Sequence, residues 1–487
     1  MTAGPDQPHQ PDDANRPSSW EDMLRSVFGA DADEALRELR ARGFDPEALG
    51  ATSDLAANPQ LLGPILDRVQ SILTQPGAGP LNADVAHDLA RQVAVTGGDP
   101  SVTLGQQRAA TDALAVADLW LDAATELPPS GGERLAWSRS EWVERTLPAW
   151  NTLAAPVASS MSDALSGVLG EQLGGIEGSV PGLPALPGLP AGALGGIDPA
   201  AMFRSLGSAV FGMQLGQAAG TLSREVFGAT DVGVPLLPGP ATVLVPSNVD
   251  AFAEGLDVPV EEVRLFLALR EDAHARLFTH VAWLRAHLLG LVEAYARGIT
   301  IDLHALEDKV ADVDLSDMDS LRGALSSGVF GLEPTPEQTA TLERLETTLA
   351  LVEGWVDEVT ARAAAPHLPH VMALREMVRR RRAAGGPAEQ TFASLVGLEL
   401  RPRRSRDAAA LWALIAAQEG EDARDHVWDH PDLLPTAEDL DDPAGYRSRR
   451  EAAQEASADL DAALAEILGE ADAPDDAADD PESPREP

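Results

Sequence analysis

Two residues of the segment Leu269–His274, Glu271 and His274, have the types and spacing of a catalytic metal site. The segment reads Leu-Arg-Glu-Asp-Ala-His and is one residue away from His-Glu-x-x-His. In that helical motif two histidines one turn apart bind zinc, and the glutamate activates a zinc-bound water. Glu271 and His274 match the motif, whereas Arg270 stands in the place of the first histidine. Because arginine has no lone pair to offer a metal, the segment indicates either a hydrolase with an altered site or an enzyme-like protein with another role.

A long helix from Val263 to Tyr295 is predicted to position these residues. Aliphatic residues recur along it at steps of four and three from Leu277 onward, and Arg270 and His274 begin the same face. This face is predicted to be buried, so its charged groups must be paired or bound to a metal. A group elsewhere in the core is therefore expected to contact them.

A second long helix, Glu337–Ala364, is expected to pack against the first. Its apolar stripe is flanked by Glu346, Glu353 and Asp357 at heptad or i,i+4 spacing. Arg270 and His274 are predicted to face this helix. Outside the tails, helical patterns dominate the sequence, so the predicted fold class is mainly α, and Thr242–Val245 is the one short strand expected.

The chain is expected to divide into five regions. Residues 1–17 and the acidic tail beyond about Glu470 are predicted to be disordered because they are polar and rich in proline or acids. Between them we expect an N-terminal helical region at 18–168, a Gly/Pro-rich linker or loop at 169–199 and a helical domain at 200–446. A helix and the acidic tail fill 447–487. Within the domain, Gly212, Gly216 and Gly220 predict a close helix pair.

Composition excludes several classes of function. The formal charge of −42 argues against a nucleic-acid binder. The chain has no cysteine, which excludes disulfides and thiolate metal sites and suits a reducing, cytoplasmic setting. Neither a signal peptide nor an 18-residue apolar span is evident, so no membrane span is expected. The arginines of residues 375–406 are interpreted as a solvated face that balances neighbouring acids.

Several separate blocks resemble the actinobacterial zincin-like metallopeptidases, a family described as hydrolases. The blocks are Phe211–Gly220, Asp231–Leu236, Leu269–Phe278, Trp283–His287, Leu349–Asp357, Gly397–Pro402 and Trp428–Pro435, and they extend over roughly 18–446. The resemblance implies a multi-helix zincin-like domain and zinc-dependent hydrolysis of a peptide or protein substrate. This chain departs from the family's complete motif at Arg270.

The resemblance also implies roles for individual residues. Glu271 matches the general base and His274 a zinc ligand, and Glu353 is the candidate third ligand, by analogy with zincins that use a downstream helical glutamate. Asp357 and His304 are possible auxiliary ligands. An alternative stays open, in which Arg270 forms a buried ion pair with Glu353 and the chain is a catalytically inactive scaffold or partner-binding protein. The sequence leaves the substrate and the oligomeric state undetermined.

Overall fold

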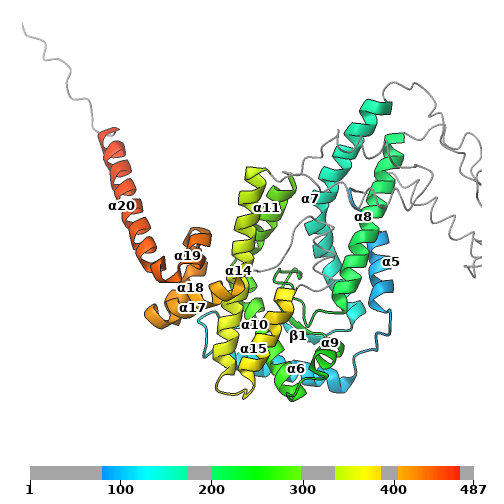
Figure 1. The fold of residues 1–487 in the computed structure, drawn as a ribbon, viewed down its shortest axis with the longest axis horizontal. Helices are drawn as coiled ribbons and strands as arrows, with labels where there is room; N and C mark the ends of the chain where they lie inside the picture. The colour runs from blue at the N-terminus through cyan, green and yellow to red at the C-terminus, as the bar shows by residue number, and fades with distance from the viewer. Residues whose placement is uncertain (1–78, 174–198, 298–334, 385–403, 472–487) are drawn as a thin grey trace, which may run out of the picture. The chain divides into compact units, whose positions relative to one another are not determined.

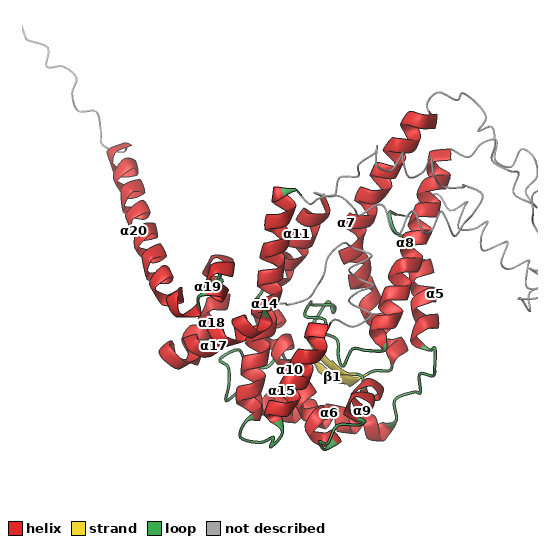
Figure 2. Cartoon of the chain, viewed as in Figure 1, coloured by secondary structure: helices red, strands yellow, loops and turns green. Residues whose placement is uncertain are grey.

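The computed structural model describes residues 79–173, 199–297, 335–384 and 404–471. The prediction of a mainly α fold is confirmed, because helices account for most of these residues (Figure 2). The segments predicted to be disordered, most of the Gly/Pro-rich stretch and the auxiliary candidate His304 lie outside the described residues.

The described elements follow one another as α5 (Ala83–Ala94), α6 (Leu104–Leu121), β1 (Glu133–Ala136), α7 (Arg139–Leu173), α8 (Pro199–Ser223), β2 (Ala241–Leu244), α9 (Pro246–Ala253), α10 (Val260–His280), α11 (Leu284–Arg297), α14 (Pro336–Ala364), α15 (Val371–Ala384), α17 (Ser405–Glu419), α18 (Glu421–His426), α19 (Ala437–Asp441) and α20 (Tyr446–Ala471). Three short 3-10 turns, Val427–Asp429, Pro431–Leu433 and Pro443–Gly445, separate the last helices.

The chain forms two compact units. One comprises residues 1–82 and 165–210, and the other comprises residues 83–164 and 211–487. All candidate site residues in the described segments belong to the second unit. The five-region division stays a prediction.

Helix packing in the second unit centres on α10 and α14. Helix α10 packs against α6 and α14, and α14 packs in turn against α17 (Figure 1). Gly354 permits the α14–α17 contact, since a Cβ there would lie 2.5 Å from the Ala408 Cβ and 2.6 Å from the Ala409 backbone nitrogen. The start of α14 is fixed by a reciprocal capping box between Thr335 and Gln338.

The glycines of α8 also mark a close helix contact. A Cβ on Gly216 would lie 2.5 Å from the Ala86 carbonyl oxygen, and one on Gly220 would lie 2.7 Å from the Ala90 carbonyl oxygen. Helices α8 and α5 therefore pack with their backbones close together, as the four-residue glycine spacing predicted. No helix among the described residues combines the length and apolarity that crossing a membrane requires.

Two short strands form a parallel pair beside α10. Strand β1 pairs with β2 in the register Glu133↔Ala241 to Ala136↔Leu244. The sequence predicted β2, displaced by one residue, and missed β1. Strand β1 is short, two of its four residues are charged, and its pairing partner is more than a hundred residues away, so its own residues give no strong strand signal.

The predicted helix Val263–Tyr295 is wrong as a single helix. The structure ends α10 at His280 and begins α11 at Leu284. No proline or glycine causes the break. The turn at Val281, with φ −93° and ψ 79°, keeps Val281 and Leu284 buried, and it lets the Trp283 indole N–H donate to the Trp428 carbonyl oxygen at 2.8 Å. Tertiary contacts therefore determine the helix end.

A buried carboxylate joins three distant parts of the unit. Asp425 accepts hydrogen bonds from the Thr125 hydroxyl at 2.6 Å and from the Trp355 indole N–H at 2.8 Å. Arg424, which is fully buried, donates to Asp425 and also to the Ala124 carbonyl oxygen. These bonds connect the turn that follows α6, the middle of α14 and α18.

Candidate functional site

The middle of α10 is buried on every side. All residues from Phe266 to Leu277 are buried, and this stretch contains Arg270, Glu271, Asp272, His274 and Arg276. A helix buried all round is ordinarily apolar, so each of these polar groups needs a partner in the protein. The partners of the three motif residues determine what the site can do.

Glu353 of α14 pairs with both ends of the altered motif. The Arg270 guanidinium donates from Nη2 to Glu353 Oε2 at 2.8 Å, and His274 Nε2 lies 3.0 Å from Glu353 Oε1. The predictions that Arg270 and His274 face the second helix, and that Arg270 forms a buried ion pair with Glu353, are therefore confirmed. All three side chains are almost inaccessible, with at most 6% exposure.

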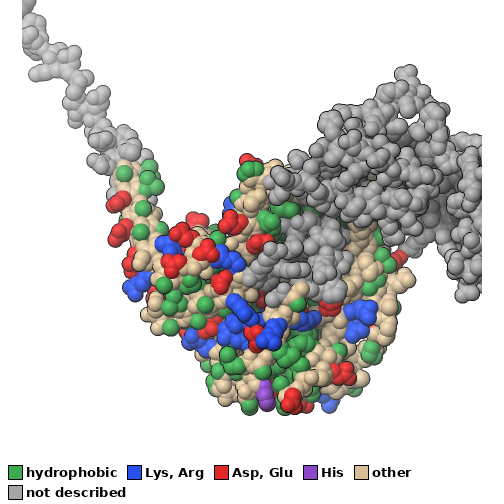
Figure 3. Space-filling model, viewed as in Figure 1, with side chains coloured by type: hydrophobic (Ala, Val, Ile, Leu, Met, Phe, Trp, Pro, Cys, Tyr) green, Lys and Arg blue, Asp and Glu red, His purple; other side chains and the backbone are tan. Residues whose placement is uncertain are grey.

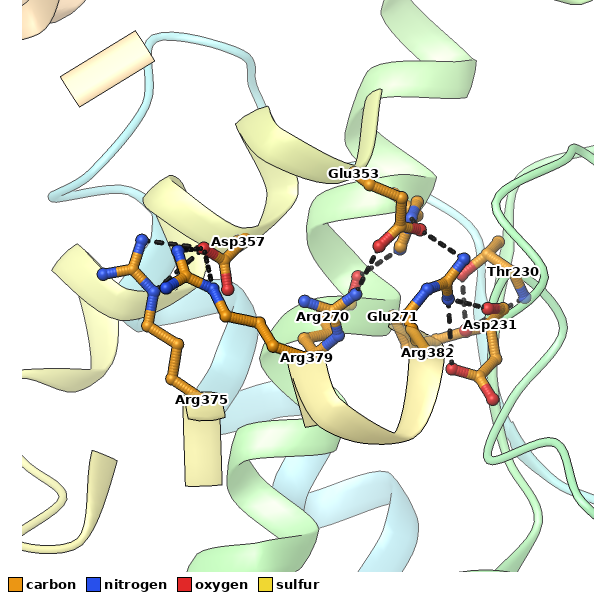
Figure 4. A network of polar contacts seen from close by, with 10 residues as sticks. Thr230, Asp231, Arg270, Glu271, Glu353, Asp357, Arg375, Arg379 and Arg382 are labelled. Atoms are coloured by element: carbon orange, nitrogen blue, oxygen red, sulfur yellow. Dashed lines mark hydrogen bonds and ion pairs between the residues drawn. The ribbon is translucent and has the colours of Figure 1, made fainter. Parts of the chain in front are cut away.

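A second arginine, from α15, binds the same carboxylate. Arg382 Nη2 lies 2.9 Å from Glu353 Oε1, and Nη1 donates to the Asp231 carbonyl oxygen and lies 3.7 Å from Asp231 Oδ1 (Figure 4). Burial by itself raises the pKa of Glu353, but the charges of Arg382, Arg270 and His274 outweigh burial and hold that pKa well below its ordinary value. Glu353 is therefore an ionised carboxylate in the folded protein.

Both ring nitrogens of His274 contact oxygen atoms of the protein. Nδ1 lies 2.9 Å from the Arg270 carbonyl oxygen, which can only accept a hydrogen bond. Nε2 faces the ionised carboxylate of Glu353, which also only accepts. Both nitrogens of the His274 ring are therefore engaged by protein oxygens of α10 and α14, and which of them carries a proton depends on the tautomer.

Glu271 points away from this cluster and ties α10 to two other segments. Its carboxylate accepts hydrogen bonds from the backbone N–H groups of Ala229 at 3.0 Å, Thr230 at 3.1 Å and Val243 at 3.1 Å. The Thr230 hydroxyl donates a fourth, at 2.6 Å (Figure 4). A carboxylate has about four lone-pair positions, so donors of the protein itself fill the acceptor capacity of Glu271.

Close backbone packing holds Glu271 in this place. A Cβ on Gly228 would overlap the Glu271 carboxylate and would lie 2.5 Å from the Val243 carbonyl oxygen, so only glycine fits there. The Trp142 indole N–H donates to the Gly228 carbonyl oxygen at 2.9 Å and fixes the loop from the other side. Burial raises the pKa of Glu271, although the hydrogen bonds from Thr230 and Ala229 oppose this shift.

The interpretation of the arginines on α15 as a solvated face is partly wrong. Arg375 and Arg379 both bind Asp357 of α14, at 2.7 Å in the case of Arg375 Nη2. Arg381 donates to a backbone carbonyl and lies 3.9 Å from the centre of the Phe227 ring. Only Arg380 is largely exposed among the arginines of this helix. Figure 3 shows basic side chains near the middle of the visible face with acidic ones among them.

The residues present do not fit a zinc ion held by three protein ligands. Arg270 and Arg382 bring two positive charges to Glu353, the carboxylate that would have to bind the ion together with His274. Asp357, the auxiliary candidate, is bound by two arginines. Within the described ranges, no three His, Cys, Asp or Glu residues are arranged to hold a metal ion.

A small cavity adjoins the cluster. It measures about 10 Å³, which is close to the space of one water molecule. Arg270, Glu271 and His274 line one side, and residues of the 227–231 segment, Leu244 and Leu267 line the rest. This cavity is too small to admit a peptide side chain without rearrangement of the surrounding segments.

The comparisons with known proteins agree with this fold. A family model described as zincin-like metallopeptidase matches residues 81–446. A solved structure from Chloroflexus aurantiacus, described as a "putative hydrolase with a novel fold", superposes with a TM-score of 0.53 at 18% identity. The match covers 76% of this chain and 99% of that one. At this identity the likeness shows the fold alone. No curated protein matches the chain.

Proposed function

Because the chain belongs to the zincin-like metallopeptidase family but holds two arginines against its candidate metal-binding glutamate, we propose that it uses the zincin-like fold without metal-dependent hydrolysis. In this proposal the protein binds a peptide or protein partner, the ligand class that a peptidase family suggests, and leaves it uncleaved. A cytoplasmic setting is part of the proposal and is supported by the absence of cysteine.

One observation carries the proposal, namely the double ion pair on Glu353. In a catalytic zinc site three protein ligands surround the metal and a water takes the open position. Here the two carboxylate oxygens of Glu353 are engaged by Arg270 and Arg382, and His274 Nε2 lies 3.0 Å from the oxygen that Arg382 contacts. A divalent cation would have to displace two guanidinium groups that are largely buried. The Arg270 side chain is 6% exposed and the Arg382 side chain is 12% exposed.

The surroundings of Glu271 support the same proposal. A general base must be within hydrogen-bond reach of the proton it takes up. The Glu271 carboxylate already accepts four hydrogen bonds that connect α10 to residues 229–230 and to β2. Its proposed role is therefore to fix the position of the motif helix.

A hydrolase remains the competing proposal, because His274 and Glu353 do come together as that function requires, 3.0 Å apart. The test uses the full chain purified without a chelator and without a histidine tag. We expect zinc well below one ion per chain by elemental mass spectrometry. We also expect a library of fluorescent peptides to contain members that bind, detected by anisotropy, and that stay intact by mass spectrometry. Stoichiometric zinc, together with peptide hydrolysis that Glu271→Gln abolishes, would establish the hydrolase instead.

A further inference from the structure

The second positively charged side chain on Glu353, Arg382, belongs to no sequence motif and comes from a different helix than Arg270. Arg270 lies on α10 and binds Glu353 Oε2, whereas Arg382 lies on α15 and binds Oε1. His274 contacts Oε1 as well, at 3.0 Å. The oxygen that a metal would share with His274 is therefore the oxygen that Arg382 occupies, and a change at residue 270 leaves that contact in place.

The loop before β2 is shaped to receive the Arg382 guanidinium. Asp231 accepts from it through its backbone carbonyl and places its carboxylate 3.7 Å away. Gly233 follows with φ +81°, a backbone conformation that other residues rarely adopt. A Cβ there would lie 3.2 Å from Glu353 Oε1 and 3.3 Å from Arg382 Nη2, so the glycine also leaves room for the ion pair.

Charge–charge contacts also hold α15 against the rest of the unit. Arg375 and Arg379 bind Asp357 one turn after Glu353 on α14, and Arg381 lies against Phe227. Helix α15 thus has two kinds of arginine. Arg375 and Arg379 bind Asp357, whereas Arg382 binds Glu353, which also contacts Arg270 and His274. This pairing supplies a matched control.

We propose that α15 is a built-in block on cation binding, in which Arg382 occupies the metal-facing oxygen of Glu353 independently of Arg270. The inference goes beyond the proposed function, since it concerns how the site excludes a metal rather than what the protein does. It follows that repairing the motif with Arg270→His alone does not restore zinc binding. Two positive charges must be removed before His274 and Glu353 can act as ligands with the new histidine.

The experiment compares zinc affinities of full-length variants by competition with a fluorescent zinc chelator. The variants are wild type, Arg270→His, Arg382→Gln and the double variant. Because a positive charge so close to a divalent ion is strongly repulsive at the dielectric of a partly buried site, we expect the double variant to bind at least roughly 100-fold more tightly than Arg270→His. The two single variants should bind weakly. Glu353→Gln added to the double variant should abolish the gain, and Co²⁺ absorption should report a four-coordinate site in the double variant alone.

Two further variants separate a specific block from a general loosening of α15. Arg270→His with Arg379→Gln, which removes an arginine that binds Asp357, should behave like Arg270→His alone. Arg270→His with Arg382→Lys should stay blocked because the positive charge remains. If Arg382→Gln fails to fold by circular dichroism, Arg382→Met replaces it in the same comparison. A gain from Arg379→Gln equal to that from Arg382→Gln would overturn the inference.

The remaining outcomes distinguish the inference from the proposed function. Arg270→His that binds zinc as tightly as the double variant overturns the inference alone, because Arg382 then blocks nothing. Stoichiometric zinc in the wild type overturns both. Peptide hydrolysis by the wild type with no bound zinc overturns the proposed function and leaves the block on metal binding standing.

Discussion

Neutralising Glu353 should destabilise the second unit strongly. The variant Glu353→Gln keeps the size of the side chain but removes the charge that Arg270, Arg382 and His274 share. The glutamate side chain is only 4% exposed, so water cannot replace the lost partner. Removing one member of a buried ion pair costs about 3–5 kcal/mol, because the other member is left as an uncompensated charge. We expect a loss in this range at neutral pH.

Urea unfolding followed by tryptophan fluorescence measures this loss. With an m-value of about 3 kcal/mol/M, a destabilisation of about 4 kcal/mol lowers the midpoint by roughly 1.3 M. Glu343→Gln is the matched control, since Glu343 is an exposed glutamate on the same helix, and it should change stability by less than about 0.5 kcal/mol. Adding Arg270→Met to Glu353→Gln should recover part of the loss by removing one unpaired charge.

The same variant has a defined pH dependence. The pKa of Glu353 is lowered in the folded protein, so the ionised carboxylate stabilises the fold at pH values above its ordinary pKa of 4.5. This contribution is lost as the pH falls from that value toward the lower folded pKa. The gap between wild type and Glu353→Gln should therefore be constant near neutrality and shrink in acid. A loss below about 1 kcal/mol, or one equal to that of Glu343→Gln, would refute the reasoning.

Three other variants test the packing around the motif helix. Glu271→Gln should lower stability by about 1–3 kcal/mol, because its amide would point a donor at donors such as the Thr230 N–H, and urea unfolding measures this. Gly354→Ala should also destabilise, despite the better helix propensity of alanine, since the new Cβ would meet the α17 backbone at Ala408; a higher melting temperature would contradict this. Burial raises the pKa of Asp272 well above its ordinary value of 3.8, so wild type loses stability as the pH rises from that value toward the higher folded pKa. Asp272→Asn has no such loss, so the amount by which its urea midpoint exceeds that of wild type should be larger at pH 8 than at pH 5.

The contacts of Arg270 and His274 with Glu353 could be predicted from the sequence, because all three residues lie on helices whose apolar residues recur at helical spacing. The apolar stripes of two segments placed Arg270 and His274 opposite Glu353, and the structure confirms these contacts. The roles of Glu271 and Glu353 in binding or chemistry stay predictions. The apolar stripes did not predict where the Glu271 side chain points, because its position depends on backbone N–H groups of residues 229–230 and of β2.

The pairing of Arg382 with Glu353 was not predicted from the sequence, although the sequence contains a signal for it. Arg375, Arg379 and Arg382 recur at steps of four and three, which places them on one helical face. Glu353 and Asp357 are likewise four apart on α14. Two helices with complementary charges at matching spacing can pair through ion pairs. A run of arginines in an acidic protein also fits an ordinary exposed surface, so the spacing alone did not identify Arg382 as the arginine that binds Glu353.

The break after His280 and the strand β1 could not be predicted for a different reason. Neither is encoded by its own residues, since the break has no proline or glycine and Glu133–Ala136 contains two charged residues in four. The break depends on Trp428, which accepts from Trp283, and the strand depends on β2. Both are local conformations selected by partners more than a hundred residues away.

The buried contacts of Asp425 have a consequence for synthesis of the chain. Thr125 and Asp425 are 300 positions apart, yet each satisfies the other in the folded unit. At translation speeds of about 5–20 residues per second, the ribosome needs roughly 15–60 s to make the segment between them. During that time Thr125 has no Asp425 to donate to, and the Trp355 indole lacks the same acceptor while the last 70 residues before Asp425 are made. A nascent chain that has not yet reached Arg424 therefore contains the entire motif helix but lacks the buried contacts of Arg424 and Asp425. We expect chaperones and proteases to bind such a chain until the last helices have been synthesised.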